Sequence, residues 1–244
     1  MALTAVFFDL DNTLIDYAGY KLRTATAAAL ELVRRGFPDT VENLVEKIFE
    51  VYEKKTMEYQ KTMYDVIVQY GLEVGRAEMF QQASLIEYNR VKFNGISPYP
   101  EALDVLRELR GMKLKLAIVT DGPRNKALQR ILLARLEDEF DAVVTKDDAG
   151  ECKPHHAPFR IALRRVHAGA KKTMMVGDSI TRDMWGAQRM GMMACHALYG
   201  DMDRKVSEEK GGMVKVERRK VLVMPDFRIN ALKDLPPLAA RLMR

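Results

Sequence analysis

Short apolar runs alternate with amphipathic helical stretches along most of this 244-residue chain, and this order restricts the possible folds more than any other feature. Apolar runs with strand-like composition predict strands over residues 4–8, 114–120, 142–145, 173–176, 192–197 and 221–224. Helical spacing predicts helices over residues 100–111, 125–136, 158–167, 181–190 and 230–241, the last interrupted by Pro236 and Pro237. Strands that alternate with helices in this way predict a doubly wound α/β domain with a mainly parallel sheet.

A helical insert interrupts this order directly after the first strand. Over residues 17–93 the apolar residues keep helical spacing, as at Leu44 and Ile48, and no comparable strand-like run appears. An insert at this point lies over the carboxyl ends of the strands, where open α/β sheets bind ligands. The sequence therefore predicts a helical cap domain over this segment and an α/β core over residues 1–16 and 94–244.

The composition is that of an ordinary globular protein, with 48% hydrophobic and 30% charged residues. No apolar run approaches the roughly 18–20 residues that cross a bilayer, and no basic segment precedes the first strand as it does in a signal peptide. We therefore expect a cytoplasmic protein without a membrane partner.

The net charge is +5, and residues 204–220 hold seven basic side chains against three acidic ones. Because no aromatic side chains are interleaved there to stack on bases, this stretch favours a solvated loop or arm and disfavours a nucleic-acid partner.

The first predicted strand ends in two carboxylates, Asp9 and Asp11. In an extended chain, side chains two residues apart face the same side. Two like charges held so close repel each other unless a cation or a proton lies between them. A hard divalent ion with oxygen ligands, such as Mg²⁺, satisfies this constraint. A helix cap or a solvated turn is the alternative interpretation of the pair.

Three further segments place polar side chains at predicted strand ends. Thr120 and Asp121 begin a turn that can present a hydroxyl and backbone N–H groups to a phosphate. Lys153 precedes a proline and can neutralise a phosphoryl group or hold a carboxylate. Asp178 follows a buried run, and Asp183 lies five residues later in the first turn of a helix, where the helix dipole alone would favour it. Each of these segments, taken alone, also fits an ordinary turn or cap.

In this order the four segments resemble the motifs of the haloacid dehalogenase (HAD) superfamily of phosphohydrolases. The matching residues are DxDxT at Asp9–Thr13, a strand-end threonine at Thr120, Lys153 before Pro154, and GDSxxxD at Gly177–Asp183. The insert lies where the C1-type cap of the superfamily belongs, and the turn after Thr120 is most similar to archaeal C1-capped phosphatases. The resemblance implies a Rossmann-like core and a phosphoric monoester hydrolase, a Mg²⁺-dependent phosphatase that acts on a small phosphorylated metabolite.

The resemblance also implies a role for each residue in catalysis. Asp9 attacks phosphorus and forms an aspartyl phosphate, and Asp11 protonates the leaving oxygen and then takes a proton from water. Thr120 and the Asp121 N–H bind phosphate oxygens, with Lys153 stabilising the developing charge.

The metal ligands implied by the resemblance are the Asp9 carboxylate, the Asp11 backbone carbonyl and Asp178. Asp183 would orient a metal-bound water or Lys153. In the insert, the candidates for facing the substrate are Tyr17, Lys21, Arg23, Tyr59 and Tyr64.

Two alternatives share this fold. A phosphomutase uses the same aspartate pair on a sugar phosphate, and a non-catalytic binding protein keeps the fold without turnover. The presence of Asp9, Asp11 and Asp178 together favours turnover, and a carboxylate at Asp11 argues against a metal-independent dehalogenase. Phosphoglycolate, glyceraldehyde 3-phosphate and sugar phosphates all fit as substrates, and either a monomer or a homodimer fits the chain.

Overall fold

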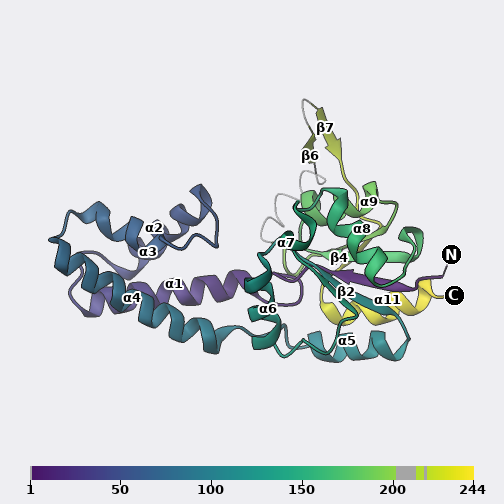
Figure 1. Cartoon of the computed structure of the whole chain (residues 1–244), viewed down its shortest axis with the longest axis horizontal. Helices are drawn as coiled ribbons and strands as arrows, with labels where there is room; N and C mark the ends of the chain where they lie inside the picture. The colour runs from purple at the N-terminus through teal and green to yellow at the C-terminus, as the bar shows by residue number, and fades with distance from the viewer. Residues whose placement is uncertain (1, 202–212, 217–218) are drawn as a thin grey trace. The chain divides into compact units, whose positions relative to one another are not determined.

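The chain divides into two compact units in a computed structural model that describes residues 2–201, 213–216 and 219–244 (Figure 1). Unit 1 comprises Met1–Asp16 and Ser97–Arg244, and unit 2 comprises Tyr17–Ile96. The insert predicted from the sequence and unit 2 both begin at Tyr17. The predicted insert ends at Phe93, and unit 2 ends at Ile96. No helix in the described ranges is long and apolar enough to cross a membrane.

Unit 1 is built around a six-stranded parallel sheet with the strand order β3-β2-β1-β4-β5-β8. The strands are β1 (Ala5–Phe8), β2 (Lys115–Val119), β3 (Ala142–Val144), β4 (Thr173–Gly177), β5 (Met193–Ala197) and β8 (Phe227–Ile229). Every residue of β1 is buried, because this strand lies between β2 and β4 with helices over both faces of the sheet. The α/β fold class predicted from the sequence is confirmed.

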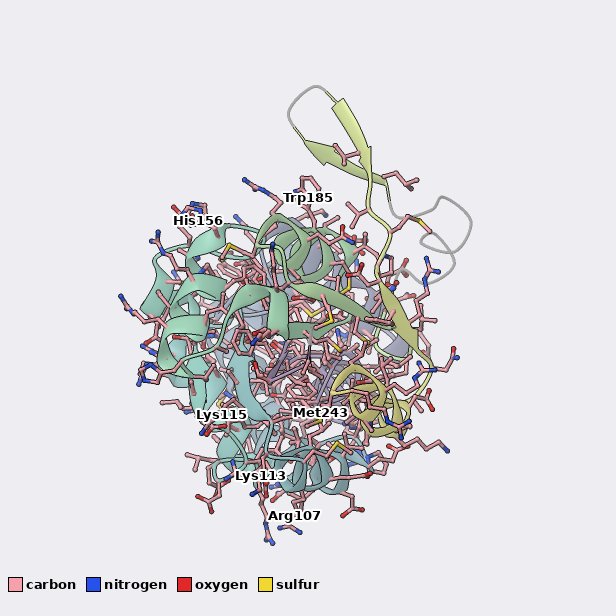
Figure 2. The ribbon with its side chains drawn as sticks, turned by 90° about the vertical axis from the view of Figure 1, so that its right-hand side faces the viewer. Arg107, Lys113, Lys115, His156, Trp185 and Met243 are labelled. Carbon is pink, nitrogen blue, oxygen red and sulfur yellow. The ribbon has the colours of Figure 1, made fainter. Side chains whose placement is uncertain are left out.

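Helices form a layer on each face of this sheet. One layer contains α8 (His156–Arg165) and α9 (Trp185–Arg189), and the other contains α5 (Ala102–Gly111) and α11 (Leu235–Leu242). Figure 2 shows His156 and Trp185 on the opposite side of the unit from Arg107 of α5. Phe7 of β1 belongs to the same buried cluster as Phe159 of α8. Because neighbouring strand residues point to opposite faces, the residues on either side of Phe7 face the other layer.

Two of the predicted helices are divided in the structure. The segment predicted as residues 181–190 consists of a π-helical turn, η3 (Ile180–Met184), followed by α9. The last predicted helix consists of a 3-10 turn, η4 (Leu232–Asp234), followed by α11. Pro236 and Pro237 lie in the first turn of α11, where a missing N–H costs no helical hydrogen bond. The prolines therefore belong to the first turn of this helix, which begins at Leu235, and the prediction that they interrupt it is wrong.

The strand predicted over residues 221–224 is not part of the main sheet. Instead, β7 (Arg219–Leu222) pairs antiparallel with β6 (Met213–Val216), and β8 is the strand that pairs with β5. Pro225 cannot donate to a strand ladder, and the Asp226 carboxylate accepts the Ala194 N–H at 2.8 Å, which ties the chain to β5 just before β8 begins. Most of the basic stretch, residues 204–212 and 217–218, lies outside the described residues.

The other helices of unit 1 are α6 (Arg124–Leu133), α7 (Lys146–Ala149) and the 3-10 turn η2 (Ala170–Lys172). Unit 2 consists of α1 (Tyr17–Arg34), α2 (Val41–Lys54), α3 (Thr62–Ile67), the 3-10 turn η1 (Val68–Tyr70) and α4 (Val74–Gly95). Its core includes Leu32, Leu44, Ile48 and Phe80, of which Leu44 and Ile48 keep the helical spacing seen in the sequence. Unit 2 therefore has a hydrophobic core of its own.

Candidate active site

The carboxyl ends of three neighbouring strands converge at one edge of the sheet. Phe8 of β1 is in register with Ile118 of β2 and with Val176 of β4, and the Asp9 N–H donates to the Val176 carbonyl at 2.9 Å. The residues that follow these strands therefore lie at the same edge. Asp9, Thr120 and Asp178 are all buried there.

Lys153 lies at the centre of this edge with a fully buried side chain. Its Nζ is 2.8 Å from Asp9 Oδ1 and 2.7 Å from Asp183 Oδ1, and it donates to the Val119 carbonyl at 2.8 Å. Burial alone would lower the pKa of Lys153, but the Asp183 and Asp9 carboxylates raise it above its ordinary value. The lysine is therefore a permanent cation held between two carboxylates.

Three carboxylates, those of Asp9, Asp178 and Asp183, each place an oxygen within 4.8 Å of the others. Burial, together with the nearby Asp9 and Asp183 charges, raises the pKa of Asp178 well above its ordinary value. Asp178 Oδ1 has no hydrogen-bond partner among the described residues. Such a group of buried carboxylates needs an added cation to be ionised together, and a set of oxygens alone suits a hard divalent ion.

The local chain explains how Asp183 enters this group. A Cβ at Gly177 would lie 2.3 Å from Asp183 Oδ2, so only glycine leaves room for that carboxylate beneath the end of β4. The Ser179 N–H donates to Asp183 Oδ2 at 3.1 Å, and the π-helical turn η3 carries the residue inward. Burial raises the pKa of Asp183 to about 6, although Lys153 acts in the opposite direction.

The side chain of Asp11 points to a different partner. Its Oδ2 accepts a hydrogen bond from Arg130 Nη1 at 2.9 Å, and the Arg130 side chain is only 6% exposed. Burial raises the pKa of Asp11 to about 6 despite the Arg130 charge, with a further contribution from Asp9. A carboxyl with such a pKa can donate a proton and accept one near neutral pH.

The turn after β2 is tied to Lys153 through the backbone. Asp121 Oδ1 accepts the Lys153 N–H at 2.8 Å, and Thr120 Oγ1 accepts the Gly122 N–H at 3.2 Å. The Lys153–Pro154 peptide bond is cis. The predicted phosphate-binding residues Thr120, Asp121 and Lys153 are thus held together at the edge that carries Asp9.

Residues 3–191 match the family model for haloacid dehalogenase-like hydrolases. The chain belongs to this family. Among curated relatives of this hydrolase, the glyceraldehyde 3-phosphate phosphatase of Pyrococcus abyssi is 29% identical over 198 residues, which cover 81% of this chain and 82% of the relative. The enzyme of the same name from Methanocaldococcus jannaschii is 25% identical over 243 residues and 99% of both chains.

Solved structures agree on the fold of this HAD-like hydrolase. A HAD phosphatase from Thermococcus onnurineus has a TM-score of 0.62 at 23% identity, with 97% of each chain covered. The putative HAD hydrolase YfnB from Bacillus subtilis, crystallised with magnesium, has a TM-score of 0.67 at 22% identity and covers 98% of this chain and 99% of its own. At these identities the likeness concerns the fold alone.

The structure thus brings Asp9, Asp178, Asp183 and Lys153 into one buried group. Asp11 lies close enough to Asp9 for the two charges to influence each other, but its side chain pairs with a residue that the sequence had not indicated.

Two arginines of the site were missed in the sequence. Arg182 Nη1 is 3.6 Å from Asp121 Oδ2, and the Asp9 and Asp183 charges outweigh burial and raise its pKa above the ordinary value. Arg130 occupies the buried face of α6 beside Ala127 and Ile131. A charged residue at that helical spacing, between two apolar residues, was a signal that could have identified it.

Proposed function

We propose that this protein is a Mg²⁺-dependent phosphatase that hydrolyses a small phosphate monoester through an aspartyl phosphate at Asp9. The observation that carries the proposal is the buried Lys153, whose Nζ lies 2.8 Å from Asp9 Oδ1 at the edge where Asp178 and Asp183 also converge. A buried nucleophile beside a fixed cation and a cluster of carboxylates suits the transfer of a phosphoryl group.

The first half-reaction would form a bond between an Asp9 oxygen and phosphorus and break the bond between phosphorus and the ester oxygen. Asp11 would deliver its proton to that leaving oxygen and release the alcohol. Lys153, the Thr120 hydroxyl and the Asp121 N–H would hold the phosphoryl oxygens while charge develops on them.

The second half-reaction would regenerate the enzyme. Asp11, now ionised, would take a proton from a water molecule whose oxygen attacks phosphorus, so that inorganic phosphate leaves and the Asp9 carboxylate is restored. The pKa of Asp11, raised to about 6 by burial, suits both directions of proton transfer. Asp9, Asp178 and the Asp11 backbone carbonyl would hold Mg²⁺, which supplies positive charge that offsets the repulsion between Asp9 and the phosphate.

Unit 2 would act as a cap that restricts the site to small substrates. It is inserted between β1 and β2, and its two connections leave unit 1 side by side, since the Tyr99 N–H donates to the Leu14 carbonyl at 2.9 Å. Among the predicted substrate-facing residues, Lys21 is 3% exposed and donates to Tyr88 and to the Met57 carbonyl within unit 2. Lys21 therefore stabilises the insert itself.

The archaeal relatives make glyceraldehyde 3-phosphate the first substrate to test, followed by phosphoglycolate and sugar phosphates. Phosphate release would be measured on this panel with Mg²⁺ and with EDTA, for the wild type, Asp9→Asn and the exposed control Asp138→Asn. We expect release that needs Mg²⁺ and Asp9 and that the control retains.

Release by a folded Asp9→Asn variant at a near-normal rate would refute the mechanism. No release from any ester, with isomerisation of a sugar phosphate, would assign a phosphomutase instead. Our proposal that the enzyme is cytoplasmic is tested by fractionation of the cells that make it.

A further inference from the structure

Arg130 is a cation in a position where the helix would otherwise be apolar. It lies on the buried face of α6 with Ala127 and Ile131, and its side chain is 6% exposed. A charge taken out of water costs several kcal/mol unless it is paired. One partner of Arg130 is Asp11, which lies 119 residues away in the sequence, through a 2.9 Å contact from Nη1 to Oδ2.

The contact gives the two carboxylate oxygens of Asp11 different surroundings. Oδ2 is engaged by Arg130, whereas Oδ1 has no hydrogen-bond partner among the residues that the structure describes. A guanidinium group is planar and holds a carboxylate in a defined orientation. The rotation of the Asp11 carboxylate is therefore restricted, and Oδ1 is the oxygen left for proton transfer.

The position of the guanidinium is itself confined by the phosphate-binding turn. A Cβ added at Gly122 would lie 3.1 Å from Arg130 Nη1, so the backbone of the turn approaches the arginine closely. The Thr120 hydroxyl accepts the Gly122 N–H in the same turn. Arg130 thus packs between the turn that would hold the phosphate and the carboxyl that would protonate the leaving oxygen.

We propose that Arg130 is a positioning residue that holds Oδ2 of Asp11, so that Oδ1 gives its proton to the leaving oxygen and later receives one from water. This inference rests on the proposed phosphatase function and adds a residue to it. Replacement of Arg130 would leave Asp9, Lys153 and the carboxylate group in place. The inference predicts that the loss falls on the proton transfer that Asp11 performs.

The test compares two esters that differ in their need for a proton. An alkyl ester such as glyceraldehyde 3-phosphate must be protonated as it leaves, whereas para-nitrophenyl phosphate releases a stable phenolate. The ratio kcat/KM reports the first half-reaction, in which the ester bond breaks. We expect Arg130→Gln to lower kcat/KM for the alkyl ester by roughly 100-fold and for the aryl ester by less than about threefold.

Three companion variants sharpen this comparison. Arg130→Lys keeps the charge and should recover part of the alkyl activity. Arg124→Gln removes an exposed arginine of the same helix that pairs with Asp148, and should change neither ester. In an Asp11→Asn background, Arg130→Gln should cause no additional loss, because a residue that acts through Asp11 has no effect once Asp11 cannot transfer a proton.

Equal losses on the two esters would overturn the inference, because a general distortion of the site would affect both. Additive losses in the double variant, or unchanged alkyl activity, would overturn it as well. If Arg130→Gln does not fold, the losses that Arg130→Lys causes on the two esters are compared instead. A larger loss on the alkyl ester supports the inference, and equal losses overturn it. The wild type is measured first. A wild type that is inert on every ester would refute the proposed function. An active wild type, combined with equal losses of the Arg130 variant on the two esters, would refute only the role of Arg130.

Discussion

Replacement of Lys153 by methionine removes the cation between two buried carboxylates while nearly preserving the shape of the side chain. The lysine is fully buried, and its Nζ lies within 2.8 Å of oxygens from Asp9, Asp183 and Val119. Because methionine has a similar length, little packing is lost. The main effect is that two buried carboxylates lose their partner, and removal of one member of a buried ion pair costs about 3–5 kcal/mol.

For a chain of this size each kcal/mol lowers the unfolding midpoint by roughly 2–4 °C, so Lys153→Met should lower it by roughly 6–20 °C. The measurement is made in EDTA at pH 8, so that no bound metal ion contributes to the stability. Trp185 is the only tryptophan of the chain and begins α9, so its fluorescence follows the unfolding of unit 1. Lys171→Met, at an exposed lysine, is the matched control. A midpoint within about 2 °C of the wild type would refute the assignment of a stabilising ion-pair centre, since that change corresponds to less than about 1 kcal/mol.

Three further predictions use the same fluorescence assay. Gly177→Ala places a methyl group against Asp183 Oδ2 and should destabilise unit 1 by about 1–3 kcal/mol and lower phosphate release. An unfolding curve identical to that of the wild type would contradict this prediction. Partial burial acts to raise the pKa of Asp148, but hydrogen bonds from Thr145 and Arg165 outweigh it and lower the pKa. The ionised Asp148 carboxylate therefore stabilises the fold above the pKa of an unfolded aspartate, about 3.9, and this stabilisation is lost as the pH falls below that value. The stability difference between the wild type and Asp148→Asn should therefore shrink below pH 4, and a constant difference would contradict this. Mg²⁺ at about 100 times its dissociation constant should stabilise the wild type by about 2.7 kcal/mol and Asp178→Asn by clearly less, and equal shifts would exclude Asp178 as a ligand.

The strand ends were predictable because parallel strands place their carboxyl ends at one edge of a sheet. The sequence therefore indicated that the residues after β1, β2 and β4 would meet, and Asp9, Thr120 and Asp178 are buried at that edge. The predicted family is confirmed by the match over residues 3–191. The roles of the individual side chains stay predictions until the variants are measured.

The last strand and the start of the helix after β4 were not predictable by the same reasoning. The apolar run at residues 221–224 has strand composition, but strand pairing depends on partners that are distant in the sequence, and Asp226 fixes the chain to β5 only after this run has ended. The π-helical turn Ile180–Met184 depends on the space that Gly177 leaves for Asp183. Both features arise from tertiary contacts.

The cations of the site show why a search of strand ends alone is incomplete. A group of buried carboxylates requires compensating positive charge. Of the cations at the site, only Lys153 was recognised, because it stands before Pro154 in one of the segments that resemble the family motifs; the structure places it in the loop between α7 and α8. Arg130 comes from the buried face of α6 and Arg182 from the π-helical turn η3. A search for charged residues on otherwise apolar helix faces would have added Arg130.

The balance of these charges also bears on substrate binding. Among the residues that the structure describes, we count five carboxylates and three cationic side chains at the site, which leaves two formal negative charges when all of them are ionised. The carboxylates are Asp9, Asp11, Asp121, Asp178 and Asp183, and the cations are Lys153, Arg130 and Arg182. A phosphate monoester would bring about two further negative charges into this region near neutral pH. Binding of the ester itself is therefore expected to need an added divalent cation, and EDTA should abolish the binding of a phosphate ester to Asp9→Asn, which cannot turn it over. Equal affinity with Mg²⁺ and with EDTA, measured by calorimetry, would show that the side chains alone compensate the phosphate.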